Sequence, residues 1–304
     1  MQIGITHLYF KILSIFMYSI SNNVVSIEVS NRGAELQSLY HKQHGIEYMW
    51  TADPAYWAKK SPVLFPIVGG LKENTYHYAG KAYQLNRHGF ARENDFDLSE
   101  QSSDSLTFSL KSNEQTKLVY PFNFLFSVKY TLEENILHVS FIVENTGDEN
   151  MWFSVGAHPA FAVPFVEGTT YEDYYLQFDE AENADRWTLS KDGLIEKAIP
   201  FLHDQSTLPL KKELFYKDAI VFKDLRSNSI TIASDKTPHG VKVGFTGFPY
   251  MGIWAAKDAD FVCIEPWCGI ADSVNTSGKL EDKEGIISLA VRQQFERTYS
   301  IEVY

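Results

Sequence analysis

The chain of 304 residues contains only two cysteines, Cys263 and Cys268. Two thiols cannot form the disulfide framework of a small secreted scaffold, so the composition favours the cytoplasm. A single Cys-x4-Cys pair also lacks the second pair that a structural zinc site usually has. We therefore expect two small buried thiols.

Long apolar runs are scarce as well. Leu8–Ile20 is interrupted by Lys11 and is too short to cross a bilayer, which takes about 20 residues. It lacks the basic start and clear cleavage site of a secretory signal. We expect residues 1–16 to be an extension outside the fold and residues 17–304 to form one domain, because no linker or fixed-period repeat divides them.

Basic residues are fewer than acidic ones, 27 against 39, which gives a net charge of −12. This balance argues against nucleic acid and anionic membranes as partners. It suits a neutral small molecule such as a sugar, although local Arg or Lys side chains leave an anionic ligand open. The sequence leaves open whether the protein is a monomer or a homodimer.

Motifs for metals, phosphates and cofactors are missing too. The sequence has no His-x-His or His-x-x-x-His spacing and none of the glycine-rich phosphate or nucleophile motifs. We therefore expect no metal and no cofactor.

Strand signals are abundant. Phe124–Leu132 and Ile136–Glu144 alternate apolar and polar residues, and Glu133-Glu134-Asn135 joins them as a hairpin would. Only Pro54–Lys59 and Glu180–Arg186 are expected to form short helical turns. Many short strands of this kind predict an all-β antiparallel sandwich or barrel. Further expected strands are Val24–Val29, Met151–Gly156, Ala219–Phe222, Ser229–Ala233, Val241–Phe245, Gly252–Ala256, Phe261–Ile264, Ile286–Val291 and Arg297–Val303.

Three motifs carry groups that move protons: RHGFAR (87–92), SVGAHPAF (154–161) and IEPWCG (264–269). Pro159 restricts His158 to an extended backbone after small residues. Glu265 ends an apolar run, so it must be paired, hydrogen-bonded or raised in pKa. If His88, His158 and Glu265 converge, they form an acid–base site for a sugar. A turn histidine and a plain salt bridge are the structural alternatives.

Other candidates are weaker. Asp218 precedes a strand and suits either sugar hydroxyls or a simple turn. Phe161 and Trp267 offer flat apolar surfaces for a sugar ring, or they pack in the core. Arg92 belongs, with Lys72 and Arg87, to the basic residues near these motifs.

Six segments occur in an order that spans nearly everything after Asn22: RGAEL, PVLFPIVGGLKE, HGFAREN, SVGAHPAF, KDAIVF and IEPWCGIAD. In this order and spacing the sequence resembles the aldose 1-epimerase (galactose mutarotase-like) family, and its LacX-type branch in particular. The resemblance implies a large antiparallel β-sandwich, a supersandwich with few short helices, that binds a sugar in a concave cleft.

The resemblance also implies roles in a cofactor-independent isomerase of carbohydrate metabolism. Glu265 would take the proton from the C1 hydroxyl, and His158 would protonate the ring oxygen. The open aldehyde would rotate and reclose as the other anomer. His88, Asp218 and Arg92 would contact the sugar, beside Trp267 and Phe161.

One position departs from the pattern. Related sequences usually have arginine where Gly70 stands, and Arg87, Arg92 or Lys72 would have to replace it. The loss favours a second hypothesis, a sugar-binding or sensing protein without catalysis. A mutarotase for a hexose phosphate is a third, and it would need a basic pocket.

Overall fold

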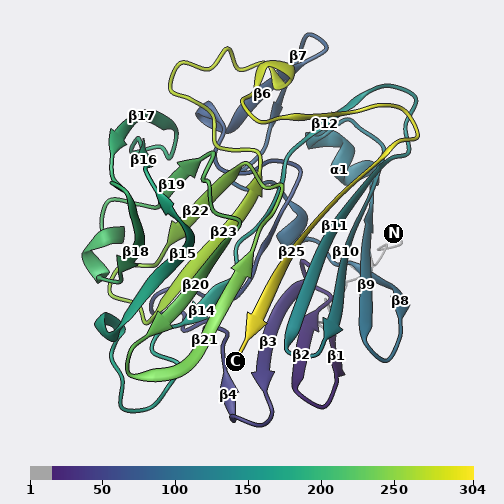
Figure 1. Ribbon diagram of the computed structural model, residues 1–304. Helices are drawn as coiled ribbons and strands as arrows, with labels where there is room; N and C mark the ends of the chain where they lie inside the picture. The colour runs from purple at the N-terminus through teal and green to yellow at the C-terminus, as the bar shows by residue number, and fades with distance from the viewer. Residues whose placement is uncertain (1–15) are drawn as a thin grey trace, which may run out of the picture.

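The computed structural model describes residues 16–304 (Figure 1). The expected extension at residues 1–16 therefore lies outside the described residues, apart from Phe16. In the described part, no helix is both long and apolar enough to cross a membrane.

Two large antiparallel sheets dominate the fold (Figure 1). The first has nine strands in the order β18 (Gln205–Pro209), β15 (Tyr174–Glu182), β20 (Ser229–Ser234), β21 (Thr237–Gly244), β25 (Gln294–Val303), β11 (Ile136–Asn145), β10 (Phe124–Glu133), β9 (Ser105–Lys111) and β8 (Asp97–Gln101). The second has the order β17 (Ile195–Pro200), β16 (Asp185–Leu189), β19 (Ile220–Lys223), β22 (Tyr250–Trp254), β23 (Phe261–Cys268), β13 (Val155–Ala157) and β5 (Val63–Leu64), and β14 (Ala160–Ala162) also pairs with β23.

Smaller elements surround these sheets. A four-stranded sheet contains β1 (Met17–Ser21), β2 (Val25–Ser30), β3 (Glu35–His41) and β4 (Ile46–Glu47). Two-stranded pairs are β6 (Thr75–Tyr78) with β7 (Lys81–Gln84), and β12 (Met151–Phe153) with β24 (Ile287–Leu289). Between residues 16 and 304 the helices are α1 (Glu114–Val119) and the short 3-10 turns Lys72–Asn74, Ala91–Glu93, Tyr171–Asp173, Lys212–Phe215 and Leu280–Asp282.

The core lies between the two large sheets. Phe126 of β10 stacks on Phe65, which follows β5, with ring centroids 4.4 Å apart. Phe178 of β15 meets Phe222 of β19 edge-on at 6.3 Å. These contacts join one sheet to the other through apolar side chains, as in a β-sandwich. The predicted all-β antiparallel sandwich is confirmed.

The helical prediction for Glu180–Arg186 was wrong, because this segment covers the end of β15 and the start of β16. Pro54–Lys59 contains a single hydrogen-bonded turn, in which the N–H groups of Tyr56 and Trp57 donate to the Asp53 carbonyl at 3.0 and 2.9 Å. The buried Glu182 carboxylate accepts the backbone N–H of Ser227 at 2.8 Å, so tertiary contacts override the helix propensity of this acidic run. The helix α1, which was not predicted, begins where Asn113 accepts the N–H groups of Gln115 and Thr116.

Candidate active site

A cleft of about 680 Å³ opens beside the second large sheet, within the size range typical of ligand pockets. The three proton-carrying groups of the sequence motifs all line it. Asp218, Arg92 and Trp267 line it as well. Six of the seven candidate residues are thus brought together, although they come from segments far apart in the chain.

Strand β23 carries Glu265 into this cleft. Successive side chains of a strand point to opposite faces, so Cys263, Glu265 and Trp267 share one face while their neighbours enter the core. The Trp267 indole Nε1 donates to the carbonyl of Ala157 at 3.2 Å. Its ring lies so close to Gly156 and Gly252 that a Cβ at either position would come within 2.7 Å of it. The two glycines make room for an indole at the floor of the cleft.

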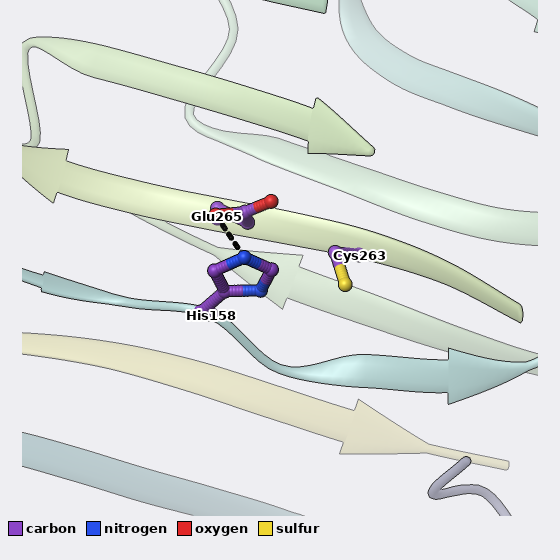
Figure 2. A group of neighbouring side chains, drawn as sticks. All are labelled: His158, Cys263 and Glu265. Atoms are coloured by element: carbon purple, nitrogen blue, oxygen red, sulfur yellow. Dashed lines mark ion pairs between the residues drawn. The ribbon is translucent and has the colours of Figure 1, made fainter. Parts of the chain in front are cut away.

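His158 follows β13 and faces Glu265 across the cleft floor (Figure 2). The imidazole Nε2 lies 3.3 Å from the Glu265 carboxylate Oε2, and the two side chains are 10% and 2% exposed. Within the described chain, neither Oε2 of Glu265 nor Nδ1 of His158 has a hydrogen-bond partner. Buried polar atoms without partners are rare and point to a functional site.

Burial sets the protonation of this pair. It lowers the pKa of His158 to about 3. It also raises the pKa of Glu265 well above its ordinary value, and the nearby Asp218 carboxylate adds to that rise. Both shifts disfavour charge. Burial therefore favours the neutral form of both groups, with the proton on Glu265 and none added to His158.

His88 is fixed in one tautomer by a tight turn. Its backbone has φ 69°, and Gly89 follows with φ 71°. The Gly69 N–H donates to His88 Nδ1 at 3.2 Å, while the His88 N–H donates to the Gly69 carbonyl at 2.9 Å. Burial holds the pKa of His88 well below its usual range, so the ring is neutral. With Nδ1 accepting, the proton lies on Nε2, which makes Nε2–H a hydrogen-bond donor.

Asp218 precedes β19 in a strained backbone conformation, φ 91°, which is rare for a residue with a side chain. Its carboxylate Oδ1 accepts the N–H of Ala219 at 2.7 Å. Strain of this kind often accompanies a functional site. A carboxylate fixed in this way can accept hydrogen bonds from ligand hydroxyls.

The aromatic walls differ from the expectation. Phe161, expected at the site, is fully buried in the core and does not line the cleft. Its backbone pairs with Val262 in β23, so the expected contact with a sugar was wrong. Trp57 and Trp254 line the cleft instead. Trp57 stacks on His158 at 4.9 Å, and Trp254 meets the same ring edge-on at 5.6 Å.

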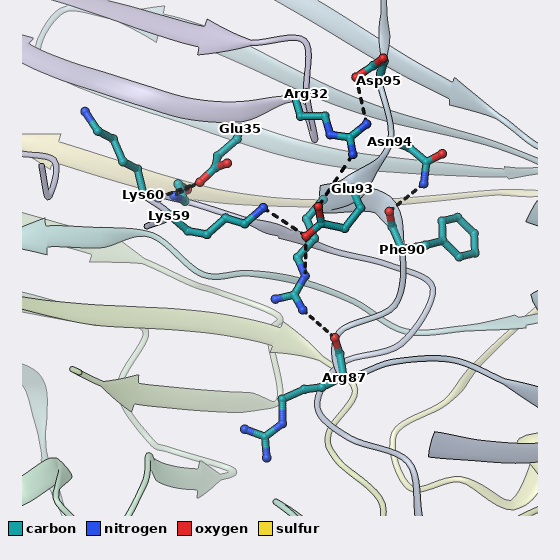
Figure 3. A network of polar contacts seen from close by, with 11 residues as sticks. Arg32, Glu35, Lys59, Lys60, Arg87, Phe90, Glu93, Asn94 and Asp95 are labelled. Atoms are coloured by element: carbon teal, nitrogen blue, oxygen red, sulfur yellow. Dashed lines mark hydrogen bonds and ion pairs between the residues drawn. The ribbon is translucent and has the colours of Figure 1, made fainter. Parts of the chain in front are cut away.

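Two of the three basic candidates reach the cleft. Arg87 and Arg92 line it, whereas Lys72 donates to the carbonyl of Val274 and does not. Figure 3 shows the ion pairs around Glu93, whose carboxylate Oε1 lies 3.2 Å from Lys59 Nζ. Arg92 Nε lies 3.7 Å from the same carboxylate, and its Nη2 donates to the Arg87 carbonyl at 3.0 Å.

Among residues 16–304, one group of side chains could hold a metal ion. The ligand atoms of His158, Cys263 and Glu265 all lie within 4.8 Å of one another. Imidazole, thiolate and carboxylate are ligands that suit zinc. Motif spacing could not find this group, because His158 is distant in sequence, although strand alternation places Cys263 and Glu265 on one face.

A sequence profile describing aldose 1-epimerase matches residues 17–284 of the chain. The chain belongs to the aldose 1-epimerase family. Protein LacX of Lactococcus lactis subsp. lactis is 35% identical over 294 residues, which cover 93% of this chain and 98% of that protein. The match therefore spans almost the whole of both sequences.

Solved structures place this aldose 1-epimerase family member among mutarotase-like folds. A galactose mutarotase related enzyme from Lactobacillus acidophilus has a TM-score of 0.91 and 38% identity, covering 95% of this chain and 97% of that one. A galactose mutarotase-like protein from Lactobacillus casei has a TM-score of 0.89 and 28% identity, covering 95% and 100%. The galactose mutarotase-like form of the sandwich is thereby confirmed.

Proposed function

We propose that the protein is a mutarotase that interconverts the α and β anomers of an aldohexose by opening and closing the sugar ring. The observation that supports this most is the contact of 3.3 Å between His158 Nε2 and Glu265 Oε2 on the floor of the cleft. The contact joins a carboxylate, which can take up a proton, to an imidazole, which can give one up. Ring opening needs one proton removed and one proton added, so the pair is matched to the reaction.

In the proposed reaction, Glu265 as the carboxylate removes the proton of the C1 hydroxyl. His158 as the imidazolium donates a proton to the ring oxygen, and the bond between C1 and that oxygen breaks. Rotation about the C1–C2 bond and reversal of both transfers give the other anomer and restore the pair.

The electrostatics of the pair favour the open form. After ring opening Glu265 is protonated and His158 is neutral, which is the state that burial favours. Part of the free energy that the two charges cost in the buried site is therefore released as the ring opens.

Neighbouring residues take binding roles in this proposal. The Nε2–H group of His88 donates to a sugar oxygen near the reacting centre and stabilises the charge that develops there. The Asp218 carboxylate accepts hydrogen bonds from sugar hydroxyls. Arg92 supports the wall of the cleft, and Trp57, Trp254 and Trp267 provide apolar surface for the faces of the sugar ring.

A second candidate is a protein that binds or senses a sugar without catalysis. Gly70, in place of an arginine expected from the family resemblance, favours it. The contact of 3.3 Å between His158 Nε2 and Glu265 Oε2 supports the enzyme instead, because a binding protein needs no matched acid and base.

We further propose that the fold, residues 17–304, acts as one domain in the cytoplasm in carbohydrate metabolism. Two buried free thiols and a net charge of −12 support this setting and argue against nucleic acid as a partner.

Polarimetry on freshly dissolved α-anomers of a panel of aldoses tests the proposal. We expect rotation to change faster than in buffer for at least one aldose. Binding of an aldose, measured by calorimetry, without any acceleration would identify a sensor.

A further inference from the structure

The charge of the cleft is opposite to that of the whole chain. Five basic residues line it, against two carboxylates, although the chain has 27 basic and 39 acidic residues. One of the two carboxylates is Glu265, whose pKa burial raises, so that it adds little negative charge. The basic residues are Arg87, Arg92, Lys191, Lys217 and Lys257.

Most of these cations lack a counter-charge. Among residues 16–304, only Arg92 of the five has a carboxylate oxygen within 4.0 Å, that of Glu93. Exposed cations of a protein rich in Asp and Glu readily find acidic neighbours, as Lys59 and Arg32 do around Glu93. The charge around the cleft is therefore available to a ligand.

Arg87 occupies a space that Gly193 leaves open. A Cβ on Gly193, whose φ is 74°, would lie 1.4 Å from the Arg87 Nη2 atom. A Cβ on Gly70 would lie 4.0 Å from Arg87 Nε. Gly70 is the position where the resemblance leads one to expect arginine. Arg87 therefore supplies positive charge close to this position.

A hydrogen bond holds the backbone carbonyl of Arg87, whereas its guanidinium makes no ion pair among residues 16–304. The Arg87 carbonyl oxygen accepts a hydrogen bond from Arg92 Nη2 at 3.0 Å, and the Arg92 guanidinium in turn lies beside the Glu93 carboxylate. Figure 3 shows the Arg87 guanidinium pointing away from this network of ion pairs. A guanidinium fixed at its base and unpaired at its tip suits an oxyanion, which it can bind through two parallel hydrogen bonds.

We infer that the substrate of this site is an aldose that carries a phosphate monoester, with Arg87 as the main phosphate-binding residue and Lys191, Lys217 and Lys257 around it. This inference rests on the proposed mutarotase function for its reaction, but not for its binding chemistry. A phosphate monoester carries about −1.5 to −2 charges at pH 7 and offers three acceptor oxygens. Several cations suit it better than the single charge of a sugar carboxylate.

The test compares four probes: galactose, galactose 6-phosphate, glucose 6-phosphate and galacturonate. Anomer exchange is measured by NMR for the parent protein, for Arg87→Ala and for Arg226→Ala. The last removes an exposed arginine outside the cleft and so matches the change in net charge. We expect Arg87→Ala to lower kcat/KM for a 6-phosphate about 10- to 100-fold, mainly through KM, because a charge-assisted hydrogen bond is lost. The loss for galactose should be much smaller than the loss for its 6-phosphate, and Arg226→Ala should match the parent with both sugars.

Equal losses for galactose and its 6-phosphate in Arg87→Ala would overturn the inference, as would a parent that prefers free galactose. A preference for galacturonate would replace the phosphate with a carboxylate. If the parent accelerates no sugar, the proposed function fails, and calorimetry then decides the inference separately. Galactose 6-phosphate must bind the parent more tightly than galactose does, and Arg87→Ala must remove that difference.

Discussion

Glu265→Gln should reveal how strongly burial holds His158 neutral. The pKa of His158 is about 3 in the folded protein, against 6.5 for an ordinary imidazole. Below pH 6.5 the unfolded chain takes up a proton that folded His158 refuses, so stability falls as pH falls. From pH 7 to pH 5 this spans about 1.5 pH units at 1.36 kcal/mol each, or about 2 kcal/mol.

Glu265 acts in the opposite direction. Its raised pKa favours its protonated form in the folded protein, while the unfolded chain releases that proton as pH rises above about 4.5. Its destabilising effect therefore grows with pH and shrinks on going from pH 7 to pH 5. In the parent the two effects oppose each other, and the Gln substitution leaves the effect of His158 alone.

The assay is urea unfolding followed by tryptophan fluorescence at pH 7 and pH 5. The free energy of unfolding of Glu265→Gln is compared with that of the double variant Glu265→Gln/His158→Asn. Because the two variants differ only at His158, the effects of all other titrating groups cancel in this comparison. We expect the difference between the two variants to change by about 2 kcal/mol between the two pH values. A difference that stays constant would refute the view that burial keeps His158 neutral.

Three further predictions concern catalysis, metal and stability. Glu265→Gln and His158→Asn should each lower kcat by about 10²–10⁴-fold with the fold intact, and His88→Asn should lower kcat less and raise KM, as anomer-resolved NMR kinetics can check. Activity should survive exhaustive chelation, and loss of activity in chelator, restored by one divalent ion, would show a metal enzyme instead. Added Zn²⁺ should inhibit the enzyme by binding His158, Cys263 and Glu265, and Cys263→Ala should raise the zinc concentration needed for inhibition. Lys283→Met should destabilise the fold by about 3–5 kcal/mol in urea unfolding, because buried Lys283 binds Asp272 at 3.1 Å and its loss leaves a buried charge unpaired, while exposed Lys279→Met should cost little.

Strand periodicity carried most of the fold prediction. The hairpin of β10 and β11 forms where it was expected, and Glu133, expected in the connection, extends β10 and pairs with Ile136. Regular alternation of apolar residues indicates a strand with one buried face, and this face is also buried in the folded protein. The failures lie where local propensity and tertiary contacts disagree, as at Glu182, whose carboxylate is bound by the backbone of Ser227.

For the site, short motifs predicted the polar groups better than the aromatic ones. His158 and Glu265 stood beside small residues, proline and a buried strand, so their environment was visible locally. Trp57 lies at the end of a short hydrogen-bonded turn, and its stacking on His158 exists only after the chain has folded. Phe161 was placed wrongly because its strand, β14, turns that side chain into the core.

The pH dependence of anomer exchange tests the acid–base pair itself. The active form holds one proton on the pair, so activity should follow a bell, whose limbs report the pair and not either residue.

The most direct test of the central claim is NMR exchange spectroscopy between the two anomers of a sugar at equilibrium, with parent and Glu265→Gln at equal concentration. The parent should increase the exchange rate above that in buffer. Glu265→Gln should reduce this increase to about 10⁻²–10⁻⁴ of the increase that the parent causes. Unchanged exchange in Glu265→Gln, with the fold intact, would contradict the claim that His158 and Glu265 open the ring together.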